Sequence, residues 1–197
     1  EGGAITAHLS DGRLDFDTVL CATGRRPNIA QLGLEHTAVK INDSGYLCVN
    51  EQFQTDEPSI FALGDMTGGW ELTPVAIAEA MVFAESQFNN TPQTMDYQSI
   101  ATAVFSSPPI GTVGLTEEAA QAAGYQTTIY QSEFRPLKHT LSGRDERTLM
   151  KLVVDTPSDR VLGAHMVGDD AGEICQGLAI ALKMGATKAD FDRTVGI

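Results

Sequence analysis

Apolar and polar positions alternate in some parts of the chain and recur with helical spacing in others, which predicts a mixture of strands and helices. Near the N-terminus, residues 4–9 and 14–23 carry strand-like patterns, and Ser10-Asp11-Gly12 stands between them. This arrangement predicts a hairpin whose second strand runs to Gly24.

The following part of the chain is rich in loop residues and then becomes apolar. Short strands are expected at residues 39–41 and 46–49, around an Asp43-Ser44-Gly45 turn. Ile60–Leu63 is apolar at every position, as in a strand that is covered on both faces. A helix is expected from about Pro74 to Phe88.

The sequence Asn89-Asn90-Thr91-Pro92 ends that helix and predicts a division into two domains, 1–92 and 93–197. The second domain is expected to be an α+β structure, an antiparallel sheet with helices packed on one side. Its expected strands cover residues 101–106, 127–132, 149–155 and 161–168, and helices follow Thr116 and residue 173.

The last long helix carries Ile174, Leu178, Ala181 and Leu182 at helical spacing, with Gly185 as its expected end. Spacing alone does not decide whether this stripe is core or an interface. Thr187 and Asp190 have the spacing of a capping box and predict one more helix.

Composition narrows the class of protein. The 13 basic and 26 acidic residues give a net charge of −13, which would repel nucleic acid and anionic membrane surfaces. No apolar stretch approaches the ~20 residues that cross a bilayer, and no signal peptide is recognised. We therefore expect a cytoplasmic protein with no nucleic-acid or membrane partner.

Cysteines and histidines show no metal-binding motif. The three cysteines form no CxxC pair and stand in apolar surroundings, which predicts buried, reduced thiols. The four histidines are scattered without ligand spacing, so no metal site is expected. The residues concerned are Cys21, Cys48, Cys175, His8, His36, His139 and His165.

Asp65 and Thr73 are the strongest candidates for ligand binding. Asp65 follows the apolar run at residues 60–63, where the carboxyl end of a parallel strand would place it near a ligand. Thr73-Pro74 predicts a helix start with Thr73 as N-cap, and its free amides would favour an anionic group. A simple turn and a simple capped helix remain alternatives.

Several segments together resemble one family. In chain order they are "CATGRRPN", "PSIFALGDM", "LTPVAIAEA", "VFSSPPIGTVGLTEEAA", "FRPLKHTLSG" and "HMVGDDAGEICQGLAIALKMGATKADFDRTVGI". This order is similar to that of the pyridine nucleotide-disulfide oxidoreductases, and within them to the glutathione reductases. The resemblance implies the end of an NADPH domain, the C-terminal half of an FAD domain, and an interface domain that forms a homodimer.

The resemblance also implies cofactor positions. By it, Asp65 binds the ribitol of FAD, and the backbone of Thr73 lies at the pyrimidine edge of the flavin. Gly24, Glu71 and Ala103 match positions near NADPH. These implied roles agree with the chemistry of a carboxylate acceptor and a helix N-terminus.

The segment "FRPLK" matches part of the disulfide-substrate site across the dimer. Its implied residues are Arg135, Leu137 and Lys138, whose two cations suit the carboxylates of glutathione disulfide. Solvent-exposed surface charge is the alternative for Arg135 and Lys138.

The catalytic motifs of the family are absent from these residues. The chain holds no GxGxxG segment, no CxxxxC pair and no His-Pro after residue 194. We therefore expect the C-terminal part of a longer enzyme, with no catalytic residue of its own and no turnover alone. Two alternatives stay open: a sister reductase of the trypanothione, mercuric or dihydrolipoamide type, or a non-catalytic dimerisation module.

Overall fold

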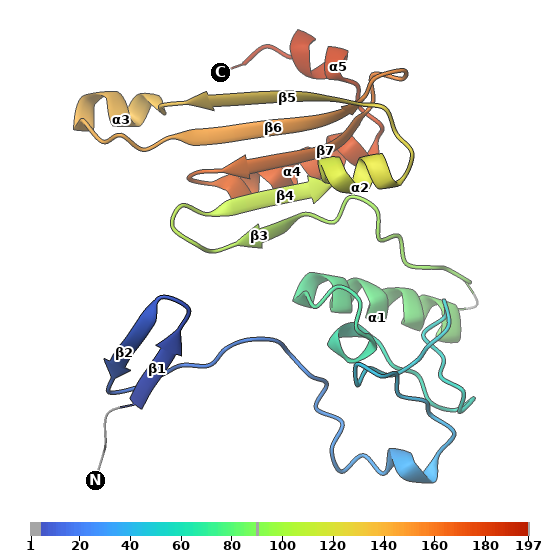
Figure 1. Ribbon diagram of the computed structural model, residues 1–197. Helices are drawn as coiled ribbons and strands as arrows, with labels where there is room; N and C mark the ends of the chain where they lie inside the picture. Colours follow the sequence, from blue (N-terminus) through green and yellow to red (C-terminus); the bar gives the residue numbers. More distant parts are fainter. Residues whose placement is uncertain (1–4, 90, 197) are drawn as a thin grey trace. The chain divides into compact units, whose positions relative to one another are not determined.

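The computed structural model describes residues 5–89 and 91–196, and the chain divides into two compact units, Glu1–Met95 and Asp96–Ile197 (Figure 1). The division falls three residues beyond the expected one at residue 92. Ala4 and Asn90, which belong to the predicted hairpin and helix break, lie outside the described residues. The two units are described separately below.

The first unit begins with the predicted hairpin. Strand β1 (Ile5–Leu9) pairs antiparallel with β2 (Gly12–Phe16), and the register joins Ile5 to Phe16. The prediction that the second strand continues to Gly24 is wrong, because β2 ends at Phe16. From Asp17 the described chain continues as an irregular segment with no strand.

Turns and isolated bridges dominate residues 17–63. The predicted turn at residues 43–45 is confirmed, because the amide of Gly45 donates to the Asn42 carbonyl at 2.9 Å. The short strands predicted at residues 39–41 and 46–49 are wrong, because only a single bridge joins Ile41 to Leu47. The predicted strand Ile60–Leu63 is wrong, because only Phe61 forms a bridge. Its neighbour is the antiparallel segment at Gln54, and a buried parallel strand would need parallel neighbours on both sides, which the sheets of the described residues do not provide.

Two short 3-10 turns, η1 (Leu34–His36) and η2 (Gly64–Thr67), precede the long helix α1 (Thr73–Phe88). The predicted helix is confirmed, but Thr73 is its first residue and Leu72 is the N-cap. The Leu72 carbonyl already accepts hydrogen bonds from the amides of Val75 and Ala76, both at 3.0 Å. The prediction of Thr73 as N-cap is therefore wrong by one position.

The second unit is a five-stranded antiparallel sheet with the strand order β3-β4-β7-β6-β5 (Figure 1). This confirms the predicted α+β class. The strands are β3 (Thr102–Val104), β4 (Ile110–Gly114), β5 (Thr127–Phe134), β6 (Thr148–Asp155) and β7 (Val161–Val167).

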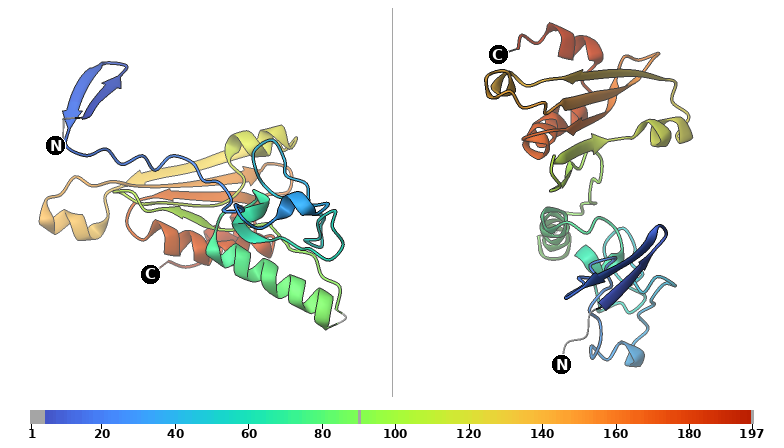
Figure 2. Two further views of the ribbon diagram at one scale, coloured as in Figure 1. Left: turned by 90° about the horizontal axis from the view of Figure 1, so that it is seen from below. Right: turned by 60° about the vertical axis from the view of Figure 1, so that its left-hand side comes forward.

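Helix α4 (Ala171–Lys183) covers one face of this sheet (Figure 2). Its buried side is formed by Ala171, Cys175, Ala179 and Leu182. These pack against Val113, Val154, Val161, Ala164 and Met166 of the strands. The expected stripe is therefore only partly buried: Leu182 belongs to the core and Leu178 packs against it, whereas Ile174 is 39% exposed.

Three short helices complete the unit. Helix α2 (Glu117–Ala122) lies over the face opposite α4, where Glu117 pairs with Lys151 at 2.9 Å, so helices are not confined to one side as predicted. Helix α3 (Leu137–Ser142) follows β5 and was not predicted. The capping box of Thr187 and Asp190 is confirmed at the start of α5 (Lys188–Arg193).

The cysteines only partly match expectation. Cys175 lies on the buried side of α4, as predicted. Cys21 and Cys48 are exposed, so the prediction of buried thiols is wrong for these two. Cys21 lies in the segment that leaves the hairpin, and its surroundings provide no cover. Within residues 5–89 and 91–196, no helix has the length and apolar character needed to cross a membrane.

Candidate functional site

Asp65 lies on η2, eight residues before the start of α1, and its side chain is 40% exposed. The structure therefore places the predicted carboxylate on a 3-10 turn rather than at the end of a parallel strand. Its Oδ2 atom accepts a hydrogen bond from Nη1 of Arg25 at 3.0 Å. Arg25 comes from the irregular segment that follows the N-terminal hairpin, so this contact joins distant parts of the first unit.

Arg25 also links Asp65 to Glu71. Its Nε atom lies 3.4 Å from Oε2 of Glu71, and the Tyr46 hydroxyl donates to the other Glu71 oxygen at 2.7 Å. The hydrogen bond to Glu71 raises the pKa of Tyr46 above its ordinary value. Both oxygens of Glu71 are thus engaged by its neighbours in the first unit.

A buried carboxylate holds the turn that carries Asp65. Glu79 is 2% exposed on α1, and its Oε2 atom accepts the amide hydrogen of Gly64 at 2.6 Å. Gly64 has φ +69, and a Cβ there would stand 3.0 Å from the Cβ of Ala76. A left-handed glycine packed against α1 and bonded to Glu79 therefore fixes where η2 begins.

Helix α1 begins six residues after the end of η2, and its N-terminus offers hydrogen-bond donors to a ligand. Its N-cap, Leu72, has an apolar side chain and caps nothing. Pro74 has no amide hydrogen, so the Thr73 amide and the positive end of the helix dipole are what this end presents. A carboxylate acceptor and an uncapped helix start fit a ligand that carries both hydroxyls and an anionic edge.

The other cofactor candidates are distributed over both units. Gly24 has φ +74, and a Cβ at this position would meet nothing within 4 Å. Its backbone is therefore open on that side. Glu71 belongs to the Arg25 network described above. Ala103 lies on β3 of the second unit, with its Cβ facing Gly172 of α4.

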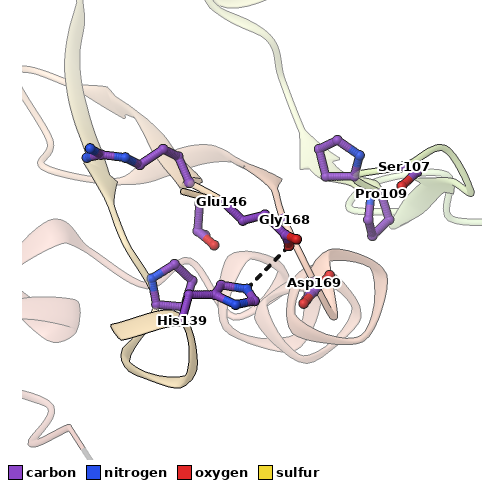
Figure 3. Close-up of a pocket in the computed structure, with 10 residues that line it drawn as sticks. Ser107, Pro109, His139, Glu146, Gly168 and Asp169 are labelled. Atoms are coloured by element: carbon purple, nitrogen blue, oxygen red, sulfur yellow. Dashed lines mark ion pairs between the residues drawn. The ribbon is translucent and has the colours of Figure 1, made fainter. Parts of the chain in front are cut away.

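The second unit contains a pocket of about 340 Å³ (Figure 3). It is lined by Ser107, Pro108, Pro109, Pro136, His139, Glu146, Arg147, Thr148, Gly168 and Asp169. His139 is 7% exposed and lies on α3, and its Nε2 atom is 3.3 Å from Oε2 of Glu146. One oxygen of Asp169 also falls in this group, in which each ligand atom lies within 4.8 Å of the others.

The three substrate candidates stand beside this pocket and differ in their surroundings. Arg135 is half-buried, and its Nη2 atom donates to the His139 carbonyl at 2.7 Å. Its Nε atom is buried without a hydrogen-bond partner among the described residues. Leu137 is 86% exposed. Lys138 pairs with Asp169 at 2.6 Å, which raises the pKa of Lys138 and lowers that of Asp169.

Sequence reasoning missed several residues of these two sites. Arg25 stands within one of the segments that carry the family resemblance, but nothing there indicates its contact with Asp65, forty positions along the chain. Glu79 had a local signal, an acidic side chain on the apolar side of a predicted helix. His139, Glu146 and Asp169 come from three separate segments, so spacing within one segment cannot reveal them.

Two family models match the chain. One, described as pyridine nucleotide-disulphide oxidoreductase, matches residues 1–80. The other, described as the pyridine nucleotide-disulphide oxidoreductase dimerisation domain, matches residues 100–197. Together they cover both units.

Similar proteins point the same way. The chain is 53% identical to glutathione reductase of Nostoc over 92% of its length, and 50% identical to the chloroplastic/mitochondrial glutathione reductase of Pisum sativum over 99%. It is 40% identical to trypanothione reductase of Trypanosoma congolense over 100% of its length. It spans 42%, 36% and 40%, respectively, of these relatives.

A solved structure shows the same fold. The HOCl-induced flavoprotein disulfide reductase RclA of Escherichia coli matches with a TM-score of 0.87 at 24% identity, covering 100% of this chain and 45% of that one. This match concerns the fold alone. The two family models, supported by close relatives across nearly every residue, decide the classification: the chain belongs to the pyridine nucleotide-disulphide oxidoreductase family.

Proposed function

We propose that this chain is the C-terminal part of an FAD- and NADPH-dependent enzyme that reduces glutathione disulfide to two glutathione molecules. The proposal rests on the position of Asp65. Its turn is anchored by Glu79, and the helix start eight residues later, at α1, has no side-chain cap. The enzyme's redox cysteines and catalytic histidine would be supplied by residues outside this chain. We propose a cytoplasmic location and no nucleic-acid or membrane partner.

Asp65 and Thr73 would hold FAD. Only Oδ2 of Asp65 is bonded to Arg25, so Oδ1 is available to accept hydrogen bonds from ribitol hydroxyls. The Thr73 amide and the helix dipole would lie at the pyrimidine edge and favour negative charge there, by about 0.3–1 kcal/mol at an exposed site. When bound, FAD supplies the acceptor for hydride from NADPH and the donor of electrons to a disulfide.

Gly24, Glu71 and Ala103 would lie near NADPH. Gly24 is open on one side, so its backbone can approach a planar ring closely. The side chain of Glu71 is occupied by Arg25 and Tyr46, which leaves its backbone for the cofactor. Ala103, on β3, is proposed on the family resemblance alone.

Arg135, Leu137 and Lys138 would contribute to the disulfide-substrate site across the dimer. Leu137 is nearly fully exposed at the start of α3 and can contact a substrate directly. Lys138 would exchange Asp169 for a glutathione carboxylate, a surface exchange with little net cost. Arg135 would act mainly by fixing the backbone at His139.

Relatives favour glutathione over trypanothione as the substrate. Two glutathione reductases are 53% and 50% identical to this chain, against 40% for the trypanothione reductase. The cationic side chains of Arg135 and Lys138 agree with an anionic substrate. Trypanothione reductase is the second candidate, and comparison of the two disulfides in one assay separates them.

The second unit would form the homodimer. The dimerisation-domain model covers residues 100–197, and Ile180 on α4 and Met184, its C-cap, are 66% and 82% exposed. Large apolar side chains that are exposed to solvent on a helix are typical of surfaces that a two-fold interface covers. Ile180→Asp should then give a folded monomer in sedimentation velocity. If the Ile180→Asp variant is still a dimer, the interface lies elsewhere. If the unmodified protein is already a monomer, the second unit is a module that does not dimerise.

The test of the proposed function is flavin retention by the enzyme of which we propose this chain to be part. Asp65→Asn should weaken FAD binding by roughly ten- to hundredfold, because a hydrogen bond to a charged acceptor contributes about 1.5–3 kcal/mol. Asp56→Asn is the matched control, an exposed carboxylate of the same unit paired with Lys40. Equal flavin retention by Asp65→Asn and Asp56→Asn would show that Asp65 is only a turn residue.

A further inference from the structure

The pocket of the second unit brings together one imidazole and two carboxylates from three different segments (Figure 3). His139 comes from α3, Glu146 from the loop that follows it, and Asp169 from the turn between β7 and α4. Histidine nitrogen and carboxylate oxygen are both ligands that zinc takes in tetrahedral sites. We propose that His139, Glu146 and Asp169 form a zinc-binding site that joins α3 to the start of α4.

The distance between the first two ligands already fits zinc. Bonds of about 2.0–2.2 Å in a tetrahedral site place neighbouring ligand atoms about 3.3–3.5 Å apart. Nε2 of His139 lies 3.3 Å from Oε2 of Glu146. An ion could therefore sit between these two atoms without displacing either residue.

The third ligand needs a small adjustment. The ligand atoms of the three residues lie within 4.8 Å of one another, so an inward shift of the Asp169 carboxylate by at most about 1.5 Å brings it to tetrahedral spacing. Its side chain is 49% exposed and can turn inward once it releases Lys138. The pocket volume of about 340 Å³ leaves space for a water molecule as the fourth ligand.

The surrounding backbone holds the ligands in place. Gly168 precedes Asp169, has φ +147, and a Cβ there would stand 2.7 Å from Oγ1 of the buried Thr148. The Gly168 amide donates to the Pro109 carbonyl at 3.0 Å, which ties this turn to the loop before β4. On the other side of the pocket, Arg135 donates to the His139 carbonyl at 2.7 Å and fixes α3.

Two cations compete with the metal. Lys138 pairs with Asp169 at 2.6 Å, and Arg144 pairs with Glu146 at 3.3 Å through the oxygen that does not face His139. Zinc binding must release Lys138, whose side chain is 53% exposed and can return to solvent. Removal of this lysine should therefore tighten zinc binding, an outcome that a purely structural ion pair would not produce.

The test is a zinc titration of the 197-residue chain, followed by calorimetry or by competition with a chromophoric chelator. Cys21→Ser and Cys48→Ser are included in every variant, because both thiols are exposed and a cysteine thiolate is itself a metal ligand. We expect one saturable zinc per chain. Glu146→Gln and Asp169→Asn should each weaken binding by at least about tenfold, the loss seen even for partners that only orient a ligand. Lys138→Ala should strengthen binding.

Asp145→Asn is the matched control. Asp145 is adjacent to Glu146, carries the same charge and is 81% exposed in a pair with Arg147. Zinc should bind this variant as it binds the parent. The decision rests on Glu146 and not on the buried His139, because Glu146 is 53% exposed and its substitution leaves the core intact.

Two results would overturn the proposal. One is the lack of saturable binding below millimolar zinc in the parent. The other is equal zinc affinity of Glu146→Gln and Asp145→Asn, which would make His139 and Glu146 an ordinary ion pair. Circular dichroism of each variant confirms that a loss of affinity is not a loss of fold. Because no flavin or substrate takes part, failure here leaves the proposed function untouched.

Discussion

Glu79 is predicted to be the residue on which the position of Asp65 depends. Glu79→Ala removes the buried acceptor for the Gly64 amide, a contact of 2.6 Å. A buried donor left without a partner costs about 1–3 kcal/mol. The first unit should lose stability by that amount, and η2, which carries Asp65, should lose its fixed position against α1. Glu79→Gln keeps an acceptor oxygen and should recover at least half of the loss.

Trp70 makes the measurement specific to the first unit. It is the only tryptophan of the chain and lies three residues before α1, 41% exposed. Urea unfolding followed by its fluorescence should show a midpoint lowered by about 1 M for Glu79→Ala, given a slope of about 1–3 kcal/mol per molar urea. In the flavoprotein, the same variant should retain less FAD than the parent.

Glu85→Ala is the control for this substitution. Glu85 lies on the same helix, and its side chain makes no hydrogen bond or ion pair with the described residues, so the change tests helix propensity alone. The midpoint of Glu85→Ala should match that of the parent. Coincident Trp70 transitions for Glu79→Ala and the parent would refute the reasoning, because the Gly64 contact would then contribute nothing.

Three further predictions concern packing, pH and activity. Gly111→Ala should destabilise the second unit by about 1–3 kcal/mol or more, because its Cβ would stand 2.1 Å from the Ala171 carbonyl oxygen, while Gly177→Ala, which has open space, should not; thermal unfolding measures both. Burial lowers the pKa of His165, so the unfolded chain takes up its proton first as pH falls below about 6.5, and stability should fall with it. For one proton this slope is at most about 1.4 kcal/mol per pH unit. His165→Asn should reduce the slope, whereas His8→Asn, at an exposed position, should not. Urea midpoints measured from pH 7 to 5 test this, and an unchanged slope in both variants would contradict it. The 197-residue chain with FAD and NADPH should show no oxidation of NADPH that depends on glutathione disulfide, since its cysteines lack the spacing of a redox pair, and a measurable rate would require a second pair.

Local signals predicted much of the second unit. The strand patterns of β5, β6 and β7, the helix start after Thr116 and the Thr187–Asp190 capping box depend on residues two to four positions apart, and the structure contains them, whereas β4 was not predicted. The stripe on α4 was left open between core and interface: Leu182 and Leu178 join the core with the small residues Ala171 and Cys175, while the larger Ile174 is exposed. Size is a poor guide where a helix lies close to a sheet.

Long-range contacts could not be predicted in the same way. The run Ile60–Leu63 has the composition of a buried strand, but a strand depends on neighbours that no pattern within the run contains. Asp65 was recognised as a candidate, whereas its ion pair with Arg25 depends on how the loop at residues 17–33 returns. The His139–Glu146–Asp169 group depends likewise on three chain segments meeting at one end of a sheet.

The central claim is that this chain belongs to a flavin-dependent reductase of glutathione disulfide. The most direct measurement is NADPH oxidation by the purified flavoprotein that contains these residues, with glutathione disulfide and trypanothione disulfide compared under the same conditions. We predict a yellow protein whose NADPH oxidation saturates with glutathione disulfide and has the higher kcat/KM for it. A protein without bound flavin, or one that prefers trypanothione disulfide or reduces neither, would contradict the account.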